Sequence, residues 1–210
     1  MPVEVVGLKE AMKAMKSLQP QLAKDLRTEM KEILKPVVKR SQALAPEAIS
    51  GLSNWTTSGK ARQISKETSM FRRGSFPKYN AAVVKAGIKS EIFPTKENAS
   101  GFISIVRIVN KSAAGAIYET AGRKNPWGQP WNPTSGSHRF SHSMNPNAGL
   151  HFINSMPRLA GKGKNRGRLI FKAWDEDQGR TTAAIMRAIA KSAERTVFYV
   201  NSASRFRNAA

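Results

Sequence analysis

Residues 115–143 read GAIYETAGRKNPWGQPWNPTSGSHRFSHS, and the character of the chain changes within this stretch. The apolar run that ends in Tyr118-Glu119-Thr120 predicts the last strand of a sheet. The loop after it is rich in Pro, Trp, Gly and His, and Glu119 is the last acidic residue before Asp175. Three interpretations follow: a catalytic loop, a partner-binding loop, or a lining that accepts negative charge.

Basic residues dominate the composition. The 210 residues include 35 Lys and Arg against 14 Asp and Glu, a formal net charge of +21. Such an excess is typical of proteins that work beside nucleic acid or an acidic partner, and a generally basic protein without a nucleic-acid role is the alternative. The absence of cysteine excludes disulfides and thiolate metal sites. Without a signal peptide or a membrane-spanning apolar run, we expect synthesis in the cytoplasm and no membrane partner.

Residues 1–46 are predicted to form a helical N-terminal part, because their apolar residues repeat at helical spacing. A first helix carries Leu8, Met12, Met15 and Leu18. A second helix begins at Pro20, is kinked at Pro36 and ends at Pro46. Its apolar stripe consists of Leu22, Leu26, Met30, Ile33, Val37 and Leu44. Its basic residues lie mainly on other faces: Lys24, Lys31, Lys35, Lys39 and Arg40.

Residues 81–119 are predicted to form an antiparallel sheet of three to four strands. The pattern alternates from Ala82 to Ile88, residues 101–110 are rich in β-branched side chains, and residues 114–119 supply a third strand. Before the sheet, residues 46–80 form a long loop with one helical turn near residues 65–71.

Residues 120–168, the excursion, are predicted to be an irregular segment with one short helix at residues 150–156. So long a loop in a compact domain indicates a function or a partner. A C-terminal helix at residues 169–203 follows, and Gly179 weakens its beginning. Its apolar face consists of Ile185, Ile189, Ala193, Val197 and Val200. The whole is an α+β fold and a single domain over residues 1–210, with the sheet packed against the N-terminal and C-terminal helices.

The excursion contains a cationic strip at residues 160–169, AGKGKNRGRL. The strip lacks the terminal Lys-Ser/Thr pair of a phosphate loop, so nucleotide chemistry is rejected. Its four charges are predicted to contact DNA phosphates or an acidic partner without reading sequence, and a solvated linker is the alternative. These charges are Lys162, Lys164, Arg166 and Arg168. Because none belongs to an apolar stripe, replacing all four by Ser is expected to leave folding intact.

Four aromatic residues punctuate the same excursion: Trp127, Trp131, Phe140 and Phe152. Aromatic residues flanked by proline lose little entropy when they anchor an interface, so we expect contacts with a neighbouring subunit. Stacking on single-stranded bases is the alternative.

No catalytic or metal-binding constellation emerges from the sequence. His138 and His142 have zinc-like spacing, but glycine and arginine surround them and no carboxylate is near, and His151 also lies in the excursion. The acidic run at Asp175 favours a helix N-terminus. Glu119 is interpreted as a structural residue at a strand end. We therefore expect no enzyme activity, no metal and no cofactor.

Three segments carry a resemblance to a known family. The opening, VEVVGLKEAMKAMKSLQPQLAKDLRTEMKEILKPVVKRSQALAP, resembles the N-terminus of the neck, or tail-completion, proteins of lambda-like long-tailed bacteriophages. GAIYETAG resembles their strand ending in "Y/V-E-x-G-T", and RLIFKAWDED resembles the entry to their C-terminal helix. The resemblance covers most of the chain in order. Here Glu119 is followed by Thr-Ala-Gly, and the loop before the last helix is longer than in the family.

The resemblance implies a structural virion protein at the phage head–tail junction, assembled in the host cytoplasm. Such a subunit forms a ring with copies of itself, expected to be a hexamer, and joins the portal or connector to the tail. Its partners would be head-closure proteins, tail terminator or tail-tube proteins, and packaged double-stranded DNA nearby. Within this class, a neck protein and a tail terminator ring protein both fit. A sequence-independent nucleic-acid-binding protein of another kind is the rival interpretation.

Overall fold

The computed structural model describes residues 20–52, 55, 77–92, 105–132, 134, 140–141, 145–163 and 165–208, with side chains as far as residue 198. The chain divides into two compact units. One comprises Met1–Pro36, Ser90–Arg107 and Gly179–Ala210, and the other comprises Val37–Lys89 and Ile108–Gln178. We call them the first and the second unit. The predicted first helix and the helical turn near residues 65–71 lie outside the described residues.

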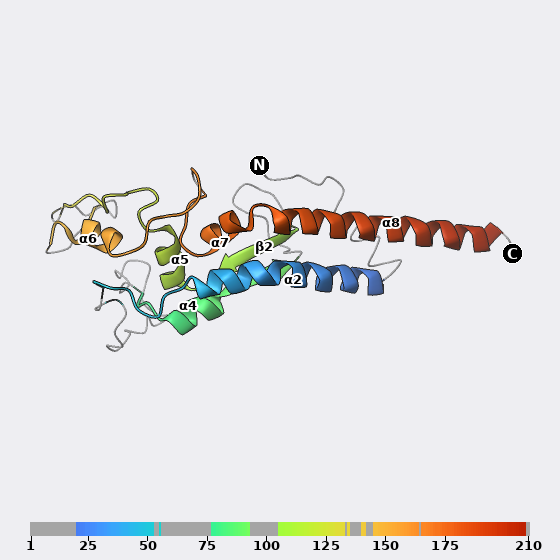
Figure 1. Ribbon diagram of the computed structural model, residues 1–210, viewed down its shortest axis with the longest axis horizontal. Helices are drawn as coiled ribbons and strands as arrows, with labels where there is room; N and C mark the ends of the chain where they lie inside the picture. Colours follow the sequence, from blue (N-terminus) through green and yellow to red (C-terminus); the bar gives the residue numbers. More distant parts are fainter. Residues whose placement is uncertain are drawn as a thin grey trace. The chain divides into compact units, whose positions relative to one another are not determined.

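The described residues form helices and a two-stranded antiparallel sheet, which confirms an α+β fold and corrects the predicted strand number. The helices are α2 (Pro20–Ala43), α4 (Ala81–Gly87), α5 (Ala113–Thr120), α6 (Ala148–Asn154), α7 (Ile170–Asp177) and α8 (Arg180–Asn208). The strands are β1 (Ile88–Ile92) and β2 (Val106–Asn110). Figure 1 shows these elements coloured along the chain.

Two predicted strands are helices. Asn80 caps α4, because its side-chain oxygen accepts a hydrogen bond of 3.1 Å from the Val83 amide. Ser112 caps α5 in the same way, through a bond of 3.2 Å from Gly115. Both are preferred capping residue types, and α4 and α5 are rich in alanine, which favours helix over strand. The short apolar patterns at residues 82–88 and 114–119 therefore wrongly indicated strands.

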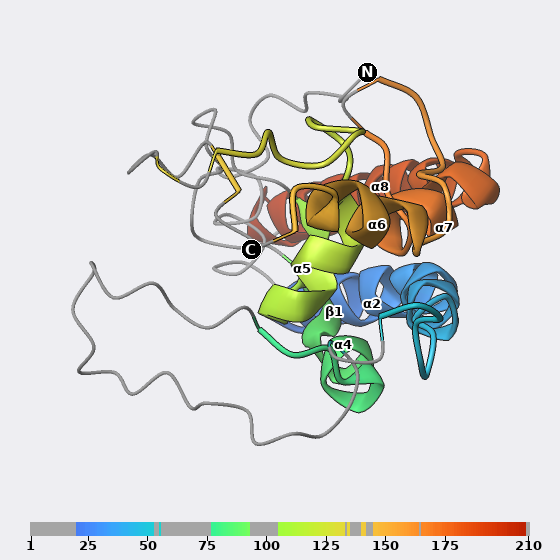
Figure 2. The ribbon, with the colours of Figure 1, turned by 90° about the vertical axis from the view of Figure 1, so that its left-hand side faces the viewer.

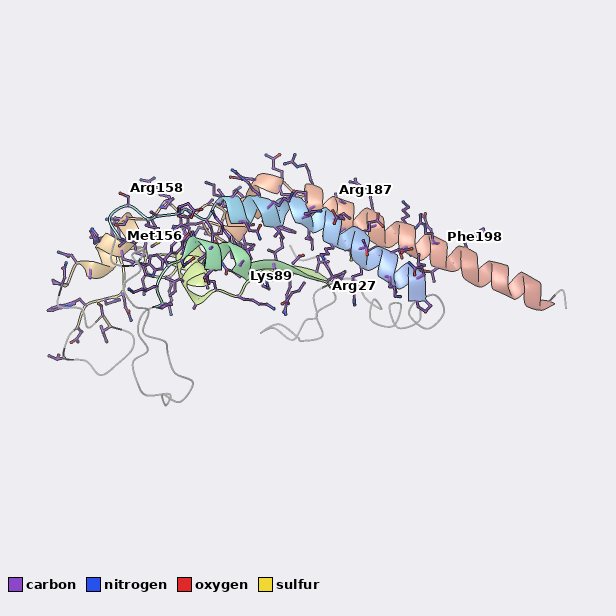
Figure 3. The ribbon with its side chains drawn as sticks, turned by 90° about the horizontal axis from the view of Figure 1, so that it is seen from below. Arg27, Lys89, Met156, Arg158, Arg187 and Phe198 are labelled. Atoms are coloured by element: carbon purple, nitrogen blue, oxygen red, sulfur yellow. The ribbon has the colours of Figure 1, made fainter. Side chains whose placement is uncertain are left out.

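The first unit contains the N-terminal part of α2, most of β1, the beginning of β2, and α8. Figures 1 and 3 show α8 running alongside this part of α2 and continuing past its start. The buried residues of α2 here are Leu22, Ala23, Leu26, Met30 and Leu34, and those of α8 are Thr181, Ile185, Ala188 and Ser192. The predicted α2 stripe is largely confirmed, with Leu34 fully buried and Ile33 half-buried.

The buried face of α8 differs from the predicted one. Ile185 is buried, but Ala193 and Val197 are exposed, and the face is completed by Thr181, Ala188 and Ser192. The predicted C-terminal helix is also interrupted. Gln178 and Gly179 have φ angles of 52° and 80°, left-handed values that end α7 before α8 begins.

An aromatic cluster lies at the centre of the second unit. Trp55 lies 5.3 Å from Tyr79 and 4.9 Å from Phe152 between ring centroids, and Tyr79 lies 5.6 Å from Tyr118. The Tyr79 hydroxyl donates to the Pro46 carbonyl at 2.9 Å, so its one polar group is satisfied. Burial raises the pKa of the Tyr79 and Tyr118 phenols, because a phenolate in this cluster would lose its hydration.

Polar contacts connect the helices of the second unit around this cluster. Gln42, in the last turn of α2, donates to the carbonyls of Lys85 and Ile88, both at 3.1 Å. Arg40 donates to the Glu176 carboxylate at 2.6 Å and connects the same end of α2 with α7. α4 packs against α5, as Figure 2 shows. The predicted short helix in the excursion is confirmed as α6.

Candidate functional site

Glu119 is a buried residue in the last turn of α5 and is 4% exposed. Its two carboxylate oxygens accept hydrogen bonds from the Leu169 amide at 2.5 Å and the Phe171 amide at 2.9 Å. These amides belong to the first turn of α7, whose own cap residue, Leu169, has no side-chain oxygen to offer. Glu119 therefore caps α7 from 50 residues away along the chain. It is a helix residue, which corrects the predicted strand end.

Arg168 provides the reciprocal contact. It is 4% exposed, and its guanidinium donates to the carbonyls of Tyr118 at 2.9 Å, Ala121 at 2.8 Å and Pro157 at 2.5 Å. The first two carbonyls belong to the end of α5, where a cation is favoured by the helix dipole. Burial lowers the pKa of Arg168, although the neighbouring Tyr118 and Glu119 act in the opposite direction. An arginine nevertheless stays charged in a protein.

Gly167 is the residue that lets Glu119 approach α7. A Cβ atom at position 167 would lie 2.2 Å from the nearer Glu119 carboxylate oxygen. The Gly167 backbone pairs with Ala160 through two hydrogen bonds, both at 2.9 Å. Residues 167–169 thus supply the close approach, the cation and the capped amide in succession. We call Glu119, Gly167, Arg168 and Leu169 the α5–α7 junction.

Two further arginines, Arg123 and Arg166, lie beside the junction. The Arg123 guanidinium lies 4.6 Å from the centre of the Phe171 ring and donates to the Arg166 carbonyl. Arg166 in turn donates to the carbonyls of Gly163 at 3.0 Å and Arg123 at 3.4 Å. Both side chains are therefore engaged within the fold.

The junction corrects the prediction for the cationic strip. Arg168 is buried, and Arg166 bonds to backbone carbonyls, so these two do not form an open phosphate-binding row. Replacing Arg168 by Ser would leave three carbonyls without their donor, so we now expect the fourfold replacement to destabilise the fold. Lys162 is exposed as predicted, and Lys164 lies outside the described residues.

The four predicted interface aromatics lie in different environments. Trp127 and Trp131 are 79% and 46% exposed, as an interface or stacking role requires. Phe140 is half-buried. Phe152 is also half-buried and packs on Trp55, so an intramolecular contact already accounts for it.

One of the three histidines lies within the residues that the structure describes. His151 lies exposed on α6, while His138 and His142 lie outside the described residues. Over the residues that the structure describes, no group of three His, Asp or Glu side chains is placed to hold a metal ion. In the same part of the chain, no helix combines the length and the apolar character that a membrane span needs.

A basic face on α2 is the feature that the sequence analysis did not select as a site. Lys24, Arg27, Lys31 and Lys35 are all exposed and recur at spacings of three and four residues. This spacing places them on one side of the helix, over about 16 Å of its length. Lys35 also pairs with Glu32 at 2.9 Å, while the other acidic residues of α2, Asp25 and Glu29, lie on a different side of the helix. We call these four residues the α2 basic face.

Comparison of the chain with protein-family models, curated proteins and solved structures finds no match.

Proposed function

We propose that this chain is a structural virion protein of a phage head–tail junction, a neck or tail-completion subunit that assembles with copies of itself around the DNA path. The α2 basic face is the observation that carries the proposal. It supplies exposed positive charges on one side of a helix. Lys and Arg side chains in such a row can contact DNA phosphates without reading the base sequence. The resemblance of the three sequence segments to the neck family supports the assignment to this junction.

The remaining features fit a structural role. Each carboxylate oxygen of Glu119 accepts a hydrogen bond from a backbone amide at the start of α7, so Glu119 acts as a helix cap. The exposed Trp127 and Trp131 suit contacts with a neighbouring subunit or a connector or tail protein. The proposal assigns no catalytic residue and no cofactor.

Deleting the gene in the phage or prophage that encodes it tests the assignment. We expect DNA-filled heads and separate tails by electron microscopy, with joined particles restored when the gene is supplied in trans. Normal joined particles from the deletion would overturn the proposal.

The α2 basic face also favours a second candidate, a sequence-independent nucleic-acid-binding protein that acts on free DNA as a monomer or dimer. Fluorescence anisotropy with a 20-bp duplex over a salt series distinguishes the two. A free-DNA binder should bind tightly at low salt, whereas a junction subunit should bind feebly before assembly.

Matched charge removals locate the binding surface. Lys24→Gln with Lys31→Gln should reduce the salt slope of duplex binding by up to about 2, because each lost phosphate contact removes roughly 0.9. Lys191→Gln with Arg195→Gln removes the same charge from exposed positions of α8 and should change the slope less. Equal effects of the two pairs would mean that net charge alone drives binding.

A further inference from the structure

α8 has a second apolar stripe besides its buried face. Met186, Ala190, Ala193 and Val197 are all exposed, and Met186 and Val197 are 38% and 59% exposed. Their spacings of four, three and four residues place them in one row along the helix. The buried face of α8 uses other positions, 181, 185, 188 and 192, so packing among the residues that the structure describes does not account for the row. We call these four residues the α8 seam.

The α8 seam has a symmetric order. Large side chains stand at its two ends, Met186 and Val197, and two alanines stand in the middle. When a second α8 is laid on the first in the opposite direction, Met186 meets Val197 of the second copy and Ala190 meets its Ala193. Small residues at the centre let two helix backbones approach closely, while the larger ends pack against each other.

The charges beside the α8 seam have the same symmetry. Arg187 and Glu194 are exposed, lie two turns apart on the same flank of the row, and have opposite signs. In an antiparallel pair, Arg187 of each copy faces Glu194 of the other, which gives two ion pairs. Within the described part of the chain, neither side chain has a hydrogen bond or ion pair. In a parallel pair, the same flank of the two copies would lie on opposite sides of the contact, so Arg187 and Glu194 would not face each other.

We infer that the α8 seam is an interface for a second copy of this chain, in which two α8 helices pair antiparallel across a twofold axis between Ala190 and Ala193. This goes beyond the proposed function, because a twofold contact joins subunits in pairs and is separate from the contacts that close a ring. Figure 3 labels Arg187 on the edge of α8 away from α2, where a second helix has access.

The expected association is weak. The α8 seam extends over about 16 Å of one helix. A stripe of this length offers less surface than the roughly 800 Å² per partner of a standard interface. The copies also repel each other, with a net charge of +21 each. The pairing should therefore be visible at high protein concentration and near 0.15 M salt, where the Debye length is about 8 Å.

Disulfide trapping provides the test, because the chain contains no cysteine of its own. Differently tagged Met186→Cys and Val197→Cys variants of the full chain are mixed at a few hundred micromolar and oxidised. In the antiparallel pair the two cysteines are opposite, whereas identical positions are offset by 11 residues, about 16 Å, too far for a disulfide. Random collision gives the mixed disulfide one half of the total, twice the yield of either like disulfide. We expect the mixed disulfide to exceed that share and to reach at least three times the yield of either like disulfide.

Two controls complete the test. Lys191→Cys, exposed on another side of α8, should give little disulfide. Arg187→Glu or Glu194→Arg alone should lower the mixed yield about fivefold by placing like charges opposite each other, and the two substitutions together should restore it. A random distribution, a predominance of like disulfides, no disulfide at all, or failure of the double charge exchange to restore the yield would each overturn the inference.

Discussion

At the scale of single residues, the α5–α7 junction shows how one carboxylate and one guanidinium can join two helix ends. Glu119 supplies negative charge where α7 begins, and Arg168 supplies positive charge where α5 ends. Each partner satisfies backbone groups that the helices leave unpaired, and both act in the favourable direction of the helix dipole. The junction therefore depends on chemistry that a neutral side chain of similar size cannot reproduce.

Glu119→Ala should destabilise the protein by about 1–3 kcal/mol, because a buried amide and a partly buried amide lose their acceptor. The free energy of unfolding from urea denaturation measures the effect. Glu29→Ala, which truncates an exposed glutamate of α2, should cost far less. Equal losses would show that the cap contributes nothing.

Gly167→Ala should cost about 1–3 kcal/mol, because its Cβ would overlap the Glu119 carboxylate. Removing the carboxylate relieves the closest overlap and leaves the Phe171 ring at 2.9 Å from the Cβ, so the double variant with Glu119→Ala should be more stable than the sum of the single losses predicts. Strict additivity in the same urea experiment would contradict this geometry.

Tyr79 should make the protein sensitive to alkali. Its folded-state pKa is raised by burial, so the stabilisation is complete below the unfolded pKa of about 10 and is lost as pH rises above it. Tyr79→Phe should cost about 1 kcal/mol at pH 7 through the lost bond to Pro46. The variant should lose less stability than the parent between about pH 10 and 12. Parallel stability profiles over this range would refute the assignment.

At the scale of elements, the predicted apolar stripe of α2 differs from the observed buried face by one residue. Met30 and Leu34 are fully buried, whereas Ile33 is half-buried, so the buried face follows a spacing of four residues at this point. Leu34→Ala should lower the free energy of unfolding by about 2–5 kcal/mol. Ile33→Ala should cost less than half as much in the same assay, and a larger loss at Ile33 would assign the core to the wrong face.

At the scale of the whole molecule, charge repulsion opposes compactness. The chain has 35 Lys and Arg and only 14 Asp and Glu, so at least 21 positive charges have no acidic side chain to pair with. Added salt screens both the repulsion among the positive charges and the attraction within the ion pairs. The repulsion is the larger of the two, so its loss should dominate. The melting temperature should therefore rise as NaCl increases from about 20 to 150 mM, because the Debye length shortens over this range. A constant or falling melting temperature would mean that attractive pairs dominate.

The sequence by itself determined the general α+β class, the buried stripe of α2, the short helix α6 and the cationic character of the chain. The cationic character follows from composition, and the α2 stripe follows from an apolar periodicity longer than ten residues. α6 has only seven residues and carries no such periodicity. The candidate site was only partly predictable. The conspicuous aromatic residues Trp127 and Trp131 are exposed as the loop composition suggested, whereas the α2 basic face carried a periodic signal that was assigned no function.

Only the tertiary structure decided that α4 and α5 are helices, and that Glu119 and Arg168 are buried structural groups. Their apolar alternation is too short to separate strand from helix, so capping by Asn80 and Ser112 and packing in the second unit determined the outcome. The partners of Glu119 and Arg168 lie up to 52 residues away along the chain. No local pattern can reveal which charge will be buried, because burial depends on backbone groups that only the folded chain brings within reach.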